Sequence, residues 1–137
     1  MYKHIAVAVD GSDNSMRAVA QAVELAKLSG LDKVDIISVI AIDVYSDMVY
    51  DPIAAHGEAQ AEIIQPAVDA FKAEGIEASL TLLHGRPGDE IIRLIDKSDV
   101  DLLVIGSRGL NALQEFAIGS VSHKVIKHVK CPVLVVK

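Results

Sequence analysis

The stretch IAVAVDGS, residues 5–12, joins a buried strand to a turn and to the start of a helix. Residues 5–9 form an uninterrupted apolar run, which is typical of a strand covered on both faces in a parallel sheet. Asp10, Gly11 and Ser12 form a turn signal, and Ser12 suits the N-cap of a helix. Apolar residues then recur at helical spacing, at Met16, Val19, Val23 and Ala26. The stretch therefore predicts a strand–turn–helix unit.

The same alternation of strand and helix continues along the chain. Apolar runs predict four further strands, at 34–42, 78–83, 102–105 and Val133–Val136. Three further helices are expected, one ending near Gly75, one starting near Gly88 and one spanning about 120–128. We expect the first of them to kink or restart at Pro66, and a loop to cover 43–55.

This order of elements predicts an α/β fold with a Rossmann-like architecture. Strands that alternate with helices favour an open, doubly wound, five-stranded parallel sheet with helices on both faces. The length of 137 residues suits one domain spanning 1–137, and the sequence contains no repeat, low-complexity tract or linker.

Composition and charge exclude several classes of protein. The net charge of −6 argues against general attraction to nucleic acid or to anionic lipid. The single cysteine, Cys131, has no internal partner for a disulfide, which suits a reducing compartment. The apolar run at 5–9 is too short for a signal peptide or a membrane span. We therefore expect a cytoplasmic protein that does not insert into membranes.

The loops after the first and fourth predicted strands carry the residues of interest. In open parallel sheets, ligands bind beyond the carboxyl ends of the strands, where the strand order reverses. One loop begins at Asp10 and the other contains Gly106, Arg108 and Gly109. If the two strands are neighbours, both loops face one crevice.

A helix that begins at Gly119 and Ser120 would offer an anion site next to that crevice. Its free N–H groups and its dipole favour phosphate, and Ser120 and Ser122 add hydroxyl donors. Arg108 adds positive charge in an acidic chain. Each glycine alone is explained better by turn geometry. Glycines, hydroxyls and Arg108 at one strand end and one helix start together favour a phosphate site.

Four of these residues match a known pattern. Gly106, Gly109, Gly119 and Ser120 reproduce the spacing G-x2-G-x9-G-[ST], which resembles the nucleotide-binding signature of the universal stress protein family. YKHIAVAVDGSDNS, HGRPGDEII and GSVSHKVIKHVKCPVLVVK are similar to the start, middle and end of that family's domain. The resemblance implies an adenine nucleotide alpha hydrolase-like fold. It also implies the subclass that is associated with ATP.

The resemblance assigns roles by position. The adenine pocket would be formed by Ala8, Val9, Asp10 and Val39. The ribose and phosphates would lie along Gly106, Arg108, Gly109, Gly119, Ser120, Val121 and Ser122. Asp10 suits ribose hydroxyls or a Mg²⁺ or Mn²⁺ ion bound with the phosphates, although an acidic turn residue before a helix is also common.

Three functions remain open at this stage. The first is a nucleotide-binding regulatory protein that holds ATP and acts through partners, and the second is a slow or partner-dependent ATPase or phosphotransferase. The third is an interaction module whose pocket is vestigial, which the intact signature disfavours. The sequence shows no catalytic base, so we predict no catalytic residue and place binding before catalysis. If the apolar strand at Val133–Val136 lies at a sheet edge, it predicts a homodimer, and the resemblance points the same way. The alternative is an ordinary terminal strand that Lys137 and its short length keep monomeric.

Overall fold

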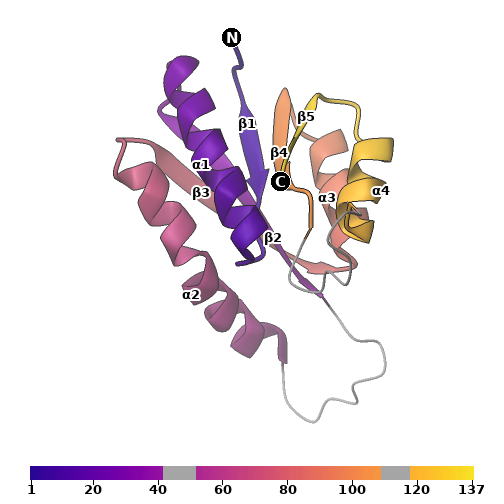
Figure 1. Cartoon of the computed structure of the whole chain (residues 1–137). Coiled ribbons are helices and arrows are strands. Elements are labelled where there is room, and N and C mark those ends of the chain that lie inside the picture. Colours follow the sequence, from indigo (N-terminus) through magenta and orange to yellow (C-terminus); the bar gives the residue numbers. More distant parts are fainter. Residues whose placement is uncertain (42–51, 109–117) are drawn as a thin grey trace.

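The computed structural model describes residues 1–41, 52–108 and 118–137. Strands and helices alternate through these residues (Figure 1). The elements are β1 (Ile5–Ala8), α1 (Asp13–Leu28), β2 (Lys33–Ala41), α2 (Pro52–Lys72), β3 (Glu77–Gly85), α3 (Pro87–Asp96), β4 (Leu102–Gly106), α4 (Ser120–His128) and β5 (Val133–Val136).

The strands form one parallel sheet in the order β3-β2-β1-β4-β5. Helices α1 and α2 cover one face, and α3 and α4 cover the other (Figure 1). The predicted doubly wound five-stranded sheet is therefore confirmed. The strand order reverses between β1 and β4, so the crevice expected from the sequence lies between two neighbouring strands.

Strand β1 lies at the centre of the sheet and is buried on both faces. Ile5 and Val7 pack in the cluster that α1 and α2 cover, together with Phe71. Ala6 and Ala8 pack in the opposite cluster, against side chains of α3 and α4. The uninterrupted apolar run is explained by this position, because neither face of the strand meets water.

The turn after β1 is built as the sequence predicts. The Ser12 hydroxyl accepts a hydrogen bond from the Ser15 N–H at 3.2 Å and caps α1. Gly11 has a φ of +86°, which side chains rarely tolerate, and a Cβ there would lie 2.4 Å from Ile63 Cγ2. The glycine therefore permits both the turn and the close approach of α2.

Some predicted boundaries were wrong. Helix α2 begins at Pro52, whereas the loop was expected to continue to 55. Proline suits the first turn of a helix, where its missing N–H costs nothing. The same helix continues through Pro66 as one element, so Pro66 does not begin a second helix. Strand β3 extends beyond 78–83 because it pairs with β2 along its whole length.

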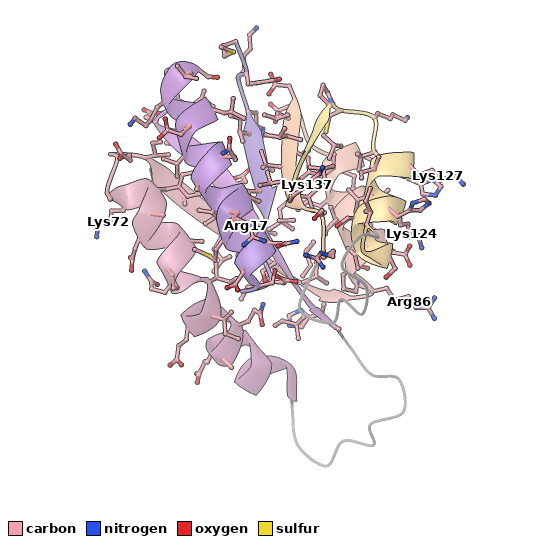
Figure 2. All side chains as sticks on the ribbon, in the orientation of Figure 1. Arg17, Lys72, Arg86, Lys124, Lys127 and Lys137 are labelled. Carbon is pink, nitrogen blue, oxygen red and sulfur yellow. The ribbon has the colours of Figure 1, made fainter. Side chains whose placement is uncertain are left out.

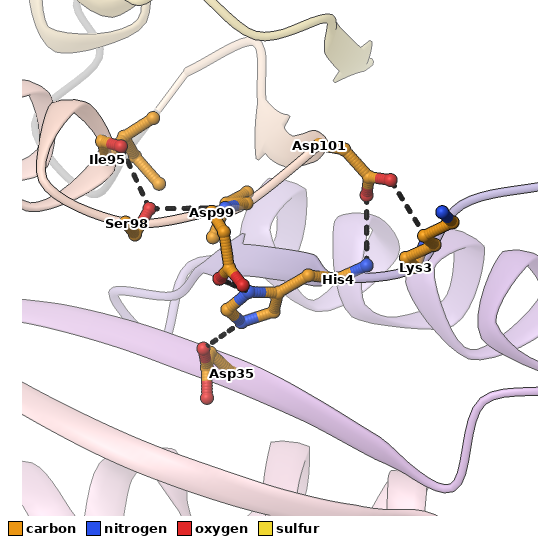
Figure 3. A network of polar contacts seen from close by, with 8 residues as sticks. Lys3, His4, Asp35, Ile95, Ser98, Asp99 and Asp101 are labelled. Carbon is orange, nitrogen blue, oxygen red and sulfur yellow. Dashed lines mark hydrogen bonds and ion pairs between the residues drawn. The ribbon is translucent and has the colours of Figure 1, made fainter.

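A polar network joins the amino ends of three strands (Figure 3). The His4 ring bonds the carboxylates of Asp35 on β2 and Asp99 before β4. Asp101 accepts the main-chain N–H groups of Lys3 and His4, at 2.8 and 3.0 Å. Burial of His4 acts against its charge, but the bonds to Asp35 and Asp99 raise the pKa of His4 above its ordinary value. The bond from His4 lowers the pKa of Asp99.

We expect His4→Gln to destabilise the protein most in mildly acidic solution. A histidine whose pKa is raised by folding stabilises the fold fully below its unfolded pKa of about 6.5. That contribution disappears as the pH rises through the folded pKa. The melting temperatures of wild type and His4→Gln should therefore differ by a few degrees at about pH 6 and converge at about pH 9. His123→Gln, on the exposed face of α4, is the control. A difference in melting temperature that grows towards alkaline pH would contradict the raised pKa of His4.

Candidate functional site

A cavity of about 370 Å³ lies at the carboxyl ends of the strands, at the point where the strand order reverses. Its size is within the range of small-molecule sites. The predicted site residues that line it are Ala8, Val9, Asp10, Val39, Gly106, Arg108, Gly119, Ser120, Val121 and Ser122. Gly109, the remaining predicted residue, lies outside the described residues. Sequence reasoning thus named residues that the fold brings together from β1, β2, β4 and α4.

One end of the cavity has apolar walls and a polar main-chain edge. The last bond between β1 and β2 runs from the Val9 N–H to the Ile37 carbonyl, at 2.9 Å. Main-chain groups alternate in direction along a strand, so Val39 directs its N–H and C=O to the same side as Ile37. In the described residues, no hydrogen bond joins Val39 to β1. A flat ligand with a donor and an acceptor on one edge can extend the sheet there.

The other end of the cavity is the start of α4. Gly119 is the N-cap, with φ −60° and ψ 154°, and no side chain caps the helix. The first turn of α4 contains no acidic residue. The Gly119 N–H donates to the Ser107 carbonyl at 2.7 Å, so the N–H groups left for an anion are those that follow it. Lys124 and Lys127 project from the same helix outside the lining of the cavity (Figure 2), and Lys124 pairs with Asp89. Ser120 and Arg108 line the cavity beside this helix end. The arrangement favours an anion because the first N–H groups of a helix have no intrahelical acceptors.

The two serines of this helix start are not equivalent. Ser122 is buried, and its hydroxyl donates to the Gly106 carbonyl at 2.7 Å. Its hydrogen is therefore used to join α4 to the end of β4, and it does not add the expected donor for an anion. Ser120 is exposed at the cavity. Of the two hydroxyls, Ser120 is the one that a ligand in the cavity can reach.

Gly106 has a packing role that the sequence did not reveal. A Cβ at this position would lie 3.0 Å from the main-chain carbonyl carbon of Asn14 and 3.1 Å from its oxygen. Helix α1 thus approaches β4 more closely than a side chain would permit. The Asn14 amide also donates to the Ser107 hydroxyl at 3.1 Å. The glycine is explained by this helix–strand contact, whether or not a ligand approaches it.

Asp10 is both a turn residue and a cavity residue. Its Oδ1 accepts the Ser12 N–H at 2.9 Å, which makes it the first residue of the turn into α1. It also lines the cavity, where a carboxylate can accept from hydroxyl groups or contribute to a cation site. Within the described residues, no three His, Cys, Asp or Glu side chains are grouped to hold a metal ion.

None of the helices described has the length and apolar character needed to span a bilayer.

Several lining residues were missed by sequence reasoning. Ile37, Ile91 and Ile105 extend the apolar wall, and Gln60 and Ile63 reach the cavity from α2. The isoleucines looked like ordinary core residues, which they also are. Gln60 lies on an amphipathic helix with no motif around it, so no local signal separates it from other polar helix residues.

Comparison with known proteins gives a consistent result. The model of the universal stress protein family matches residues 1–137. Universal stress protein YxiE of Bacillus subtilis is 34% identical over the full length of both chains. A universal stress protein in complex with cAMP is 31% identical, with a TM-score of 0.76 over 99% of this chain and 97% of that one. The Archaeoglobus fulgidus universal stress protein in complex with dAMP is 28% identical, with a TM-score of 0.74 over 99% and 98%.

Proposed function

Because the chain belongs to the universal stress protein family, we propose that it binds ATP with Mg²⁺ or Mn²⁺ in this cavity and acts as a regulatory nucleotide sensor. One observation carries the proposal: a single cavity has an apolar end, bordered by the main chain of Val39, and a second end formed by a helix N-terminus that no side chain caps. The similar proteins with cAMP and dAMP support an adenine nucleotide as ligand.

The described residues suit the parts of this ligand in order. Adenine fits between the apolar walls with its polar edge at Val39, since it presents a donor and an acceptor side by side. Asp10 would accept from ribose hydroxyls or help to hold the ion. The phosphates would meet Arg108 and the start of α4 at Gly119 and Ser120. A divalent ion would offset phosphate charge in a chain whose own net charge is −6.

Direct measurement of the bound ligand tests this proposal. Mass spectrometry of nucleotide released from the purified protein should detect ATP, and calorimetry with ATP and Mg²⁺ should give one site per chain. Calorimetry with Mn²⁺ in place of Mg²⁺ would compare the two ions. Absence of any released nucleotide, together with no binding of ATP at millimolar concentration, would contradict the proposal.

We also propose a homodimer through β5, the edge strand formed by Val133–Val136. Hydrogen bonds run from the Leu103 N–H to the Pro132 carbonyl and from the Ser107 N–H to the Val136 carbonyl. Even-numbered residues of β5 thus direct main-chain groups at β4, and Val133 and Val135 direct theirs outward. An outward row of main-chain groups can pair with the same strand of a second copy.

Val135→Pro should weaken this dimer by at least about tenfold. Proline removes an outward N–H at Val135 and leaves the bonds between β5 and β4 in place. Sedimentation equilibrium over a range of concentrations measures the change, and circular dichroism checks the fold. A wild-type monomer, or a variant dimer as tight as the wild type, would contradict the pairing.

A further inference from the structure

Gln60 is the polar side chain that α2 contributes to the cavity, among the residues described. Its Nε2 donates to the Ser38 hydroxyl at 2.8 Å. Ser38 is buried, with 1% of its surface exposed, and it precedes Val39 in β2. The bond therefore holds the Gln60 amide next to the strand segment whose main chain forms the polar edge of the cavity.

This bond also determines which part of the amide is left for a ligand. With Nε2 turned to Ser38, the amide oxygen is the remaining acceptor, and in the described part of the chain no donor is bonded to it. The Val39 carbonyl, directed like that of Ile37 toward the side of β2 on which β1 ends, is a second acceptor. The polar edge thus offers two oxygen acceptors that come from different elements.

Two neighbouring acceptors match one feature of a purine. The 6-amino group of adenine carries two N–H donors, and one hydrogen bond to the main chain leaves the second without a partner. A 6-oxo purine such as hypoxanthine places an oxygen in the same position, where it would face two other oxygens. Sites that bind a donor group discriminate strongly against analogues that lack it, because their own polar groups then stay unpaired.

We propose that Gln60 is a specificity-determining residue, which selects 6-amino over 6-oxo purine nucleotides by accepting the second N–H of the amino group. This inference rests on the proposed function, because it requires the base to lie at Val39. Ser38 acts as a positioning residue, since its hydroxyl holds the amide in the orientation that presents the oxygen.

The ratio of ATP affinity to ITP affinity measures this selection, because ITP has an oxygen in place of the 6-amino group and a hydrogen on N1. The change of this ratio between the wild type and the Gln60 variants isolates the part that is due to Gln60. Gln60→Leu should weaken ATP binding by roughly three- to tenfold and should not weaken ITP binding, so that the ratio falls by at least a similar factor. Gln60→Glu keeps an acceptor and should keep the preference for ATP. Ser38→Ala, which frees the amide, should give an intermediate ratio.

Gln65→Leu is the matched control, since Gln65 lies on the exposed side of the same helix and bonds Asp69 at 2.9 Å. Its ratio should equal that of the wild type. If Gln60→Leu binds ATP with an unchanged ratio, or if Gln65→Leu changes the ratio equally, the role of Gln60 is wrong and the proposed function stands. If the wild type binds neither nucleotide, the proposed function fails, and this inference fails with it.

Discussion

Ser120→Asp should lower the affinity for ATP by about 10- to 100-fold while leaving the fold at least as stable as the wild type. Ser120 is exposed at the cavity and is the first residue of α4, after the N-cap Gly119. A carboxylate there would repel phosphates at the place where we propose that the helix N-terminus attracts them. The same carboxylate interacts favourably with the dipole of α4, so the helix itself is not weakened. A loss of ATP affinity without a loss of stability would show that the substitution damages the binding site and not the fold.

Two controls sharpen this experiment. Adenosine has no phosphates, so its affinity should be nearly the same in Ser120→Asp and in wild type. Ser79→Asp adds the same charge at an exposed position on β3, outside the residues that line the cavity. It should leave ATP affinity within about twofold, because salt screens distant charges. Equal ATP affinity in Ser120→Asp and wild type would place the phosphates elsewhere.

Gly106→Val should destabilise the fold by about 3 kcal/mol. A Cβ at Gly106 already lies 3.0 Å from the main chain of Asn14, and the two methyl groups of valine extend further. The obstacle is helix backbone, so α1 must move away from β4, and it cannot do so by turning a side chain. Denaturant unfolding at constant pH measures the loss. A variant as stable as the wild type would show that α1 can be displaced at little cost.

Gly57→Val is the control for this substitution. Gly57 lies in α2, and a Cβ at this position would meet no neighbouring atom within 4 Å, so valine there should change stability by less than about 1 kcal/mol. The comparison also bears on ATP binding. If Gly106→Val lowers both ATP affinity and stability, the loss of binding is explained by the displacement of α1. A loss of ATP affinity in Ser120→Asp with the fold intact is explained by repulsion of the phosphates.

Local sequence determined the strands and helices of this protein, and it also determined the turn after β1 and the start of α4, which both border the cavity. The apolar run at 5–9 predicts a central strand because only a strand covered on both faces can bury every residue. Ser12 caps α1 through a contact within three residues. Gly119 and Ser120 start α4 where the pattern placed them. These features depend on neighbours in the chain, so spacing and residue type are sufficient to predict them.

Tertiary structure decided which of these elements pack together, and therefore which side chains contact one another or line the same cavity. The pairing of β1 with β4 brings the turn at Asp10 to the loop at Gly106. His4 bonds Asp35 and Asp99, 31 and 95 residues away. Gln60 reaches the cavity only because α2 lies against β2, where Ser38 holds its amide. Such contacts depend on strand order and helix placement, which arise from packing of the whole chain and leave no mark in local periodicity.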